Sequence, residues 1–510
     1  MEGELGKIPV DSRCSAILCA PLTWNEFGKA TSDSNSTCLP CDTNPTLFGQ
    51  VTCGEVKTSR EREILDKIFA ATGGRYWSKP HDNWMRPGVP ICSREGIFCG
   101  GGARSNEGVL DIKLGGFGLR GEIPAELWEL SNLRTLILTD NAVGIGFPGI
   151  ENVQGLRVLK CSACQIRSLV GLQKAPQSLE ELHLARNQFE GFIPDEIYEL
   201  RQIRSLFLNN NHFAGKISSA MGKMTGLSRL ELWDNKLTGR VPSELGLLSK
   251  LEYFSLSENE LSGAIASQFE QLDQLVDVRM ARQRGRAKLE GPLPTFKNSE
   301  FLNHVDLSGN GFSGWLPPSF LSKVNPEQQV EADLSSNEFT GPFPEAWGRF
   351  ESLNIDLSGN MISVLPEALC TKNEWNNGMV GLVNSCDAIL CKPGTFRHQA
   401  GRQTEPTQPC QSCPGGVDAA PFYGSRICLD PRQRAEREIL VDFYQGTDGT
   451  RWLIQTDWAS SRPTCTWFGV TCDDDGFIQE LSLPTNWLKS TSSTIDAVSL
   501  LFTLSNLKVR

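Results

Sequence analysis

The chain has 510 residues, of which 39% are hydrophobic and 21% charged; this ordinary globular composition excludes a disordered or collagen-like protein. Its formal net charge of −11 argues against a general binder of nucleic acid or of anionic membranes. No apolar stretch is long enough to cross a bilayer. The 17 cysteines favour an oxidising compartment, although the first residues lack the basic and apolar segments of a secretory signal.

Two copies of one long unit follow each other along the chain, and matching positions differ by 372 to 375. Each copy contains a Glu-Arg-Glu run, Glu61-Arg62-Glu63 in the first and Glu436-Arg437-Glu438 in the second. Apolar residues with helical spacing come directly after each run, so we expect a short amphipathic helix in each copy. These residues are Ile64, Leu65, Ile68 and Phe69, and Ile439, Leu440, Phe443 and Tyr444.

Both ends of the sequence interrupt a repeating unit. Cys370 has no counterpart in the first copy, and the final LSNLKVR stops where LSNLRTL at 130–136 continues into further repeats. We therefore expect a fragment of a longer protein, with the signal peptide and any membrane anchor outside it.

A shorter repeat lies between the two copies. From Leu133 the pattern L-x-x-L-x-L-x-x-N-x-L recurs every 23 to 27 residues, with Cys164 and Gln283 at two of the Asn positions. Alternating apolar residues predict short strands that bury their leucines only when neighbouring repeats stack. The Asn side chain is expected to turn inward and satisfy buried backbone groups. This Asn ladder comprises Asn141, Asn187, Asn211, Asn235, Asn259, Asn310, Asn337 and Asn360.

The repeats also carry an L-x-G-x-I-P signature at Gly121-Glu-Ile-Pro124, Gly191-Phe-Ile-Pro194 and Gly239-Arg-Val-Pro242. They resemble the plant-type leucine-rich repeat, over about 105 to 375 and again from near 476. The resemblance implies an α/β solenoid: a right-handed superhelix, or horseshoe, with a parallel sheet on its concave face.

The segments beside the repeats resemble known modules as well. Cys465 to Cys472 is similar to the C-x-W-x-G-V-x-C of the cap that precedes plant-type repeats, whereas the first copy has Arg94 where the Trp should be. The Cys391-Lys-Pro-Gly-Thr-Phe396 and Cys410-Gln-Ser-Cys413-Pro414 segments resemble disulfide modules of tumour-necrosis-receptor or ephrin-receptor type. The expected order is a Cys-rich module, an N-terminal cap, about ten repeats, a second Cys-rich module, a second cap and the start of a second array, over 1–57, 58–104, 105–375, 376–432, 433–475 and 476–510.

The module cysteines are candidates for disulfides or zinc, because the Cys-x-x-Cys pairs at Cys38 and Cys410 have ligand spacing. Each module holds more cysteines than one tetrahedral site needs, which favours disulfides. Spacing alone leaves many connectivities open. The resemblance implies the pairs Cys19–Cys38, Cys41–Cys53, Cys92–Cys99, Cys370–Cys386, Cys391–Cys410, Cys413–Cys428 and Cys465–Cys472, with Cys14 unpaired.

Two further short motifs have alternative interpretations. Cys161-Ser-Ala-Cys164 has the spacing of a redox or zinc motif, but its cysteines fall on an inward Leu position and an Asn position. We favour two buried cysteines that act as small hydrophobic residues. Asn35-Ser36-Thr37 is a glycosylation acceptor, which fits an extracellular loop at Asn35.

The x positions of the strands should face solvent on the concave sheet. In the middle repeats they hold aromatic and charged residues, the composition of interface anchors, although a large solvated sheet also carries some aromatics by chance. The candidate ligand-binding residues are His183, Arg186, Phe207, Asn209, Arg229, Glu231, Trp233, Asp234, Tyr253 and Glu258.

Two charged groups elsewhere in the array leave alternatives open. Asp306, Asp333 and Asp356 stand at equivalent positions in Asp-Leu-Ser runs; they are candidates for a cation site, or common filler of this repeat type, which we favour. The irregular segment from Arg279 to Lys288 holds five basic residues, either as a contact for an anionic ligand or as a solvated loop.

No phosphate-binding loop, kinase motif, nucleophile elbow or metalloprotease helix occurs in the sequence. We therefore expect no enzyme activity, no cofactor and no resident metal. The sequence predicts a ligand-recognition scaffold from the extracellular part of a receptor-like cell-surface protein, binding a protein, peptide or glycan. Alternatives are a secreted inhibitor of wall-degrading enzymes and an adhesion or matrix protein.

Overall fold

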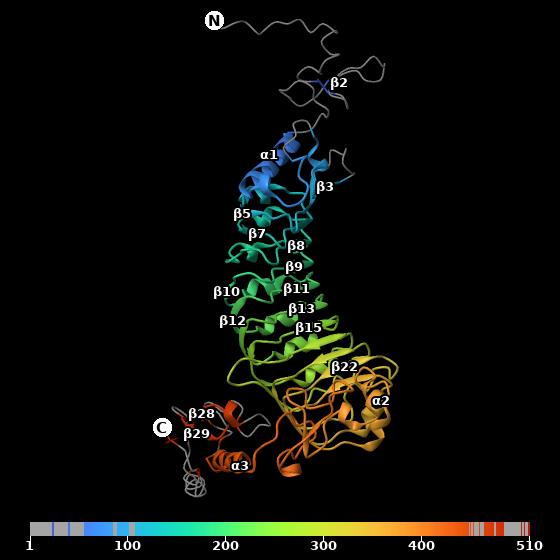
Figure 1. Cartoon of the computed structure of the whole chain (residues 1–510). Coiled ribbons are helices and arrows are strands. Elements are labelled where there is room, and N and C mark those ends of the chain that lie inside the picture. The colour runs from blue at the N-terminus through green and yellow to red at the C-terminus, as the bar shows by residue number, and fades with distance from the viewer. Residues whose placement is uncertain are drawn as a thin grey trace. The chain divides into compact units, whose positions relative to one another are not determined.

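The computed structural model describes residues 56–84, 89–100, 108–447, 464–473 and 476–483, the short pieces 23–24, 39–40 and 508–509, and single residues 449, 452, 458, 501 and 504. The chain divides into two compact units, Met1–Phe189 and Glu190–Arg510, which we describe separately. Short parallel strands alternate with single turns of 3-10 helix in both units (Figure 1).

Helix α1 (Val56–Ala71) is the first helix described in the first unit. Ile64, Leu65, Ile68 and Phe69, the apolar residues of the predicted amphipathic face, are each at most 4% exposed. The carboxylate of Glu61 is also buried, and its Oε2 accepts a hydrogen bond from the backbone N–H of Val109 at 3.3 Å. The Glu-Arg-Glu run thus attaches the helix to the first long strand of the repeats.

A sheet of short strands follows in the first unit. Strand β3 (Ile97–Cys99) pairs antiparallel with β4 (Val109–Lys113), and β6 (Thr135–Ile137), β8 (Val158–Lys160) and β9 (Glu181–His183) continue the sheet in parallel. A second, two-stranded parallel ladder joins β5 (Arg120–Ile123) to β7 (Ala142–Ile145). The 3-10 turns of this unit are η2 (Gly74–Tyr76), η3 (Ile91–Ser93), η4 (Ala125–Glu129), η5 (Ile150–Asn152) and η6 (Leu172–Lys174). Strands β1 (Thr23–Trp24) and β2 (Leu39–Pro40) form a separate antiparallel pair.

The second unit carries the same pattern through a longer parallel sheet. Its strands are β11 (Ser205–Phe207), β13 (Arg229–Glu231), β15 (Tyr253–Ser255), β18 (Asp277–Arg279), β20 (His304–Asp306), β22 (Val330–Asp333) and β24 (Leu353–Asp356). Two further parallel ladders contain β10 (Glu190–Gly191), β12 (His212–Lys216), β14 (Lys236–Gly239) and β16 (Glu260–Leu261), and β17 (Gly263–Ala264), β19 (Leu289–Gly291), β21 (Gly311–Trp315), β23 (Glu338–Pro342) and β25 (Met361–Val364).

The remaining elements of the second unit are mostly short. The 3-10 turns between its strands are η7 (Asp195–Glu199), η8 (Ser219–Lys223), η9 (Ser243–Leu247), η10 (Ser267–Gln271), η11 (Glu345–Arg349) and η12 (Glu367–Thr371). After them come α2 (Met379–Val383), η13 (Cys386–Ala388), β26 (Thr395–Phe396), β27 (Gln411–Ser412), η14 (Gly416–Asp418), α3 (Pro431–Gly446), η16 (Thr464–Thr466), β28 (Val470–Cys472), β29 (Ile478–Leu481) and β30 (Lys508–Val509).

The core is the column of leucines that the repeat predicted. Leu230 and Leu232 of one repeat are fully buried, as are Leu206 and Leu208 of the repeat before it. One strand of three residues cannot bury such a face alone, so stacking supplies the apolar burial that stabilises each repeat. Gly239, which ends β14, has a φ of 79°, a backbone conformation that favours glycine. The predicted leucine-rich repeat solenoid is confirmed.

The ladder asparagines lie at the inner turns of the repeats. Asn235 donates from Nδ2 to the carbonyl oxygens of Leu208 and Leu232, both at 3.0 Å, and its Oδ1 accepts from the N–H of Phe213 at 3.0 Å. One amide thereby satisfies buried backbone groups of two consecutive repeats. Equivalent Nδ2 bonds to the carbonyl of the repeat's own strand occur throughout the set, at Asn141, Asn187, Asn211, Asn259, Asn310, Asn337 and Asn360.

The two stand-ins at ladder positions behave differently from each other. Gln283 reproduces the ladder, since its Nε2 donates to Leu256 O at 3.1 Å and its Oε1 accepts from Leu261 N at 3.0 Å. Cys164 instead forms a disulfide with Cys161. The interpretation of these residues as two free, small hydrophobic cysteines was therefore wrong, although both are buried. The chain turns between them, so that their Cα atoms lie 5.7 Å apart, within reach of a bridge.

The second Cys-rich segment ends the first repeat array. It contains the bridges Cys391–Cys410 and Cys413–Cys428, and Cys370–Cys386 joins it to the last repeat. Asn376 links the two parts, because its Oδ1 accepts from Ile355 N and its Nδ2 donates to Ala388 O, both at 2.7 Å. The segment thus covers the open end of the leucine column.

The second cap repeats the first in its contacts. Glu436, the counterpart of Glu61, accepts from Ile478 N at 2.9 Å, and Cys465–Cys472 corresponds to Cys92–Cys99. Trp467 is buried in the second cap, with the guanidinium of Arg437 4.7 Å from its ring centroid.

Arg94 occupies the equivalent place in the first cap. It is 3% exposed, forms a 2.6 Å ion pair with Asp66 and lies 5.2 Å from the ring centroid of Trp84. In the first copy a buried arginine, ion-paired with Asp66, therefore takes the place of the tryptophan of the cap motif.

Several predictions lie outside the described residues: Cys14, the pairs Cys19–Cys38 and Cys41–Cys53, the acceptor Asn35, and most of 484–510. Within the described ranges, no helix combines the length and apolar character that a bilayer span requires.

Candidate functional site

The exposed face of the second unit's sheet presents side chains in rows. The register aligns Arg229 with Tyr253 and Tyr253 with Asp277, and two residues further along it aligns Phe207 with Glu231. Glu231 is the last residue of β13, and Trp233 lies two residues beyond it. Phe207, Trp233 and Tyr253 are half-buried, so each keeps part of its ring open to solvent. The sheet therefore brings the three predicted aromatics of adjacent repeats onto one surface, which we call the central patch.

Charged groups surround these aromatics. The guanidinium of Arg229 lies 4.3 Å from the ring centroid of Tyr253, a cation–π distance. Arg279 forms a bidentate pair with the carboxylate of Asp277, donating from Nε at 2.8 Å and from Nη2 at 2.6 Å. Such pairing fixes the orientation of the guanidinium. Asp277 and Arg279 were not among the predicted site residues, because the register that brings them beside Tyr253 and Ser255 is a property of the folded sheet.

Glu231 is the carboxylate at the centre of the central patch. Its pKa is raised to about 7, chiefly by burial and in part by nearby Asp277, against the opposing effects of Arg279, a hydrogen bond from Trp233 and Arg229. A carboxylic acid with this pKa changes charge near neutral pH. The central patch can therefore present either a neutral or an anionic group at this position.

A hydrogen-bonded network runs along the turn edge of the same repeats. Asn209 donates to Asn210 Oδ1 at 2.9 Å, and Asn210 donates to Asp234 Oδ2 at 2.6 Å. Arg284 pairs with Asp234 at 2.8 Å and also with Glu258. Asn209, predicted to face the ligand, is only 7% exposed, and its amide is used within this network.

Arginines of the basic segment from Arg279 to Lys288 pair with acids of the repeats. Arg279 pairs with Asp277, Arg282 lies 3.6 Å from Glu258, and Arg284 holds two carboxylates of the preceding repeats. At these three positions the segment supplies counter-charges to carboxylates within the repeats. Asp234 and Glu258 are already engaged, which restricts what they offer to a ligand.

His183 and Arg186 belong to the first unit and are described there alone. His183 is half-buried on β9, with its Nε2 3.7 Å from Glu181 Oε2, and Lys160 pairs with the same carboxylate oxygen at 2.6 Å. Arg186 is exposed at a turn with a φ of 54°.

The three Asp-Leu-Ser aspartates have a local role. Asp306 Oδ1 accepts from the N–H and the hydroxyl of Ser308, and Asp356 Oδ1 does the same with Ser358. Burial and the neighbouring Asp356 and Asp306 raise the pKa of Asp333. These turns account for the repeated motif without a cation, and the described residues contain no cluster of three metal-ligating side chains.

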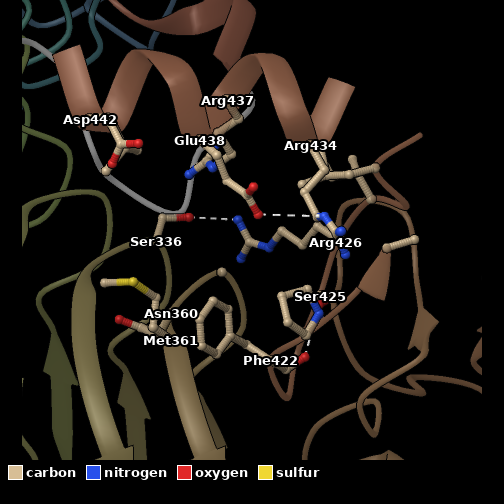
Figure 2. A pocket seen from close by; sticks show the side chains of 16 residues that line it. Ser336, Asn360, Met361, Phe422, Ser425, Arg426, Arg434, Arg437, Glu438 and Asp442 are labelled. Carbon is tan, nitrogen blue, oxygen red and sulfur yellow. Dashed lines mark hydrogen bonds and ion pairs between the residues drawn. The ribbon is translucent and has the colours of Figure 1, made fainter. Parts of the chain in front are cut away.

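A separate pocket of about 470 Å³ lies in the second unit. It is lined by the last repeats (Ser336 and 359–361), the second Cys-rich segment and helix α3. Figure 2 shows Phe422 and Met361 on one side, the side chains of α3 on the other, and Arg426 between them. We call it the junction pocket. No single motif could reveal it, because its walls come from three segments far apart in the sequence.

The comparisons with known proteins agree with this architecture. A family model described as Leucine Rich Repeat matches residues 178–200 and 301–322. The ectodomain of the plant membrane receptor kinase GASSHO1/SCHENGEN3 from Arabidopsis thaliana, solved in complex with CASPARIAN STRIP INTEGRITY FACTOR 2, is similar at 26% identity and a TM-score of 0.55; the match covers 61% of this chain and 37% of that one.

Two other solved structures are more distant. A TDR receptor has 28% identity and a TM-score of 0.45, covering 52% of this chain and 45% of that one. A plant ice-binding protein has 21% identity and a TM-score of 0.45, covering 56% and 89%. No curated protein matches the sequence significantly.

The chain therefore contains leucine-rich repeats, in a fold similar to that of a plant receptor kinase ectodomain, of which it spans 37% of the length. The resemblance of the Cys-rich segments to tumour-necrosis-receptor or ephrin-receptor modules stays a prediction.

Proposed function

We propose that the chain is a non-catalytic recognition scaffold whose central patch binds a peptide or a protein segment. The observation that carries this proposal is the alignment of Arg229, Tyr253 and Asp277 beside Phe207 and Glu231 on one exposed sheet face. Tyr, Trp and Arg side chains are the groups that most often supply binding energy at protein interfaces.

The chemistry of the central patch favours a peptide. Its half-buried rings offer apolar contact area, while Arg229 and the Asp277–Arg279 pair offer charges of both signs at fixed positions. An extended peptide presents side chains and backbone groups at comparable spacing. The similar plant receptor ectodomain was solved in complex with CASPARIAN STRIP INTEGRITY FACTOR 2, which supports a binding role for this fold.

We also place the chain outside the cell. Six disulfides form among the described residues, in a cap, the repeats, the second Cys-rich segment and the second cap. Structural disulfides of this number persist in oxidising compartments and are rare in the cytosol. A cell-surface receptor-like protein fits both the disulfides and the binding face.

The test is selection of peptides from a random library displayed on phage, followed by affinity measurement by calorimetry. Binding of the selected peptides should fall at least about tenfold in the double variant Trp233→Ala/Tyr253→Ala. The matched control is Phe192→Ala/Trp315→Ala, which removes two aromatics that are 74% and 73% exposed outside the central patch. Equal losses in both double variants, or no loss in the first, would contradict the proposal.

A further inference from the structure

The junction pocket combines an apolar surface with an excess of positive charge. Met361, Phe422, Ile427, Leu429 and Val441 contribute apolar groups. Its charged lining consists of three arginines and two acids: Arg426, Arg434, Arg437, Glu438 and Asp442. The volume of about 470 Å³ lies within the usual range for small-molecule sites.

The three arginines differ in their partners: one forms an ion pair with an acid of the lining, and another is held by hydroxyl groups. Arg434 Nε lies 3.5 Å from Glu438 Oε1 on the same helix, so this pair is largely self-compensated. In the described part of the chain, Arg426 makes its hydrogen bonds with two neutral hydroxyls, from Nη1 to Ser336 Oγ at 2.6 Å and from Nε and Nη2 to Ser358 Oγ at 3.2 and 2.6 Å. These bonds orient the guanidinium but do not neutralise its positive charge; Figure 2 shows the bond to Ser336.

Arg437 adds a second cation with little access to water. Its guanidinium lies 4.7 Å from the ring centroid of Trp467, and Nη1 donates to Thr464 Oγ1 at 3.5 Å. Burial lowers its pKa to about 10, so it remains charged at neutral pH at a desolvation cost. A ligand anion would meet this cation in the lining of the pocket.

We propose that the junction pocket binds a small organic acid: an apolar body seated against Phe422 and Met361, with one anionic group directed at Arg426 and Arg437. Since the walls come from the last repeats, the Cys-rich segment and α3, such a ligand would hold these three parts together. This site is distinct from the central patch and does not depend on the peptide ligand proposed for it.

The experiment uses 8-anilinonaphthalene-1-sulfonate, an aromatic acid that fluoresces in apolar sites, with the complete chain. We expect one saturable site, displaced by decanoate and not by decanol or inorganic phosphate at the same concentration. Displacement by decanol as strong as by decanoate would show an apolar site with no preference for an anionic group, and would overturn the proposal. Displacement by phosphate alone would show an inorganic anion site and overturn it as well.

Variants then locate the site. Arg437→Gln should weaken dye binding about tenfold, because a charged hydrogen-bonding group is lost, and Phe422→Ala should weaken it too. Asp442→Asn removes an exposed negative charge from the lining and should tighten binding several-fold at the single saturable site that decanoate competes for. Partial unfolding would instead add dye binding that does not saturate at one site. The controls are Arg240→Gln and Phe192→Ala, exposed residues of the repeats. Affinity unchanged by Arg437→Gln and Asp442→Asn would refute the site.

Discussion

Replacement of Asn235 by leucine should destabilise the solenoid, although the two side chains are similar in size and the site is 3% exposed. The change removes the side-chain acceptor of the buried Phe213 N–H. It also removes one of two donors from each of the carbonyls of Leu208 and Leu232, which keep their bonds from Asn211 and Asn259. Each unsatisfied buried group costs about 1–3 kcal/mol. One unsatisfied N–H and the two lost donations, offset in part by the added apolar side chain, give an expected loss of about 2 kcal/mol.

The assay is urea denaturation of the oxidised protein, followed by tryptophan fluorescence. Asn235→Asp keeps the oxygen that accepts from Phe213 and loses both donated bonds, so it also tests whether donation matters. Asn303→Leu is the matched control, because Asn303 is exposed. A free energy of unfolding for Asn235→Leu within about 0.5 kcal/mol of the unchanged protein, or equal losses for Asn235→Leu and Asn303→Leu, would refute the ladder argument.

Three other predictions concern charge and redox state. The pKa of Glu231 is raised to about 7 from an ordinary value of 4.5, so the folded state holds this proton more tightly than the unfolded state. The resulting contribution to stability is complete below the unfolded pKa and is lost as pH rises through 7. Glu231→Gln should therefore flatten the dependence of the free energy of unfolding on pH from pH 4 to 8. Glu61→Gln should lower the melting temperature by loosening α1 from Val109, whereas Glu63→Gln, on an exposed ion-paired residue, should change it little. Thiol labelling without reduction should detect one cysteine, Cys14; labelling of most cysteines would contradict an extracellular placement.

The fold could be predicted because its signal is periodic. Leucines such as Leu230 and Leu232 recur at fixed positions, and each repeat must bury them against the next one. The ladder register also followed from the sequence, since Asn235 and its equivalents occupy one position of every repeat.

The site was less predictable, for reasons of geometry. Strand alternation places Tyr253 on the exposed face, but the pairing of Arg284 with Asp234 depends on the path of an irregular loop. The bridge between Cys161 and Cys164 likewise depends on the turn between them. The junction pocket required three segments to meet, and no sequence pattern encodes that meeting.

Footprinting of a bound peptide tests the central claim most directly. A peptide selected on the intact chain is added, and oxidation by hydroxyl radicals is measured at Trp233, Tyr253 and Trp315 by mass spectrometry. We expect strong protection of Trp233 and Tyr253 with no change at Trp315, which is 73% exposed on another ladder. Protection at Trp315 with Trp233 and Tyr253 unchanged would show that the chain binds its partner elsewhere.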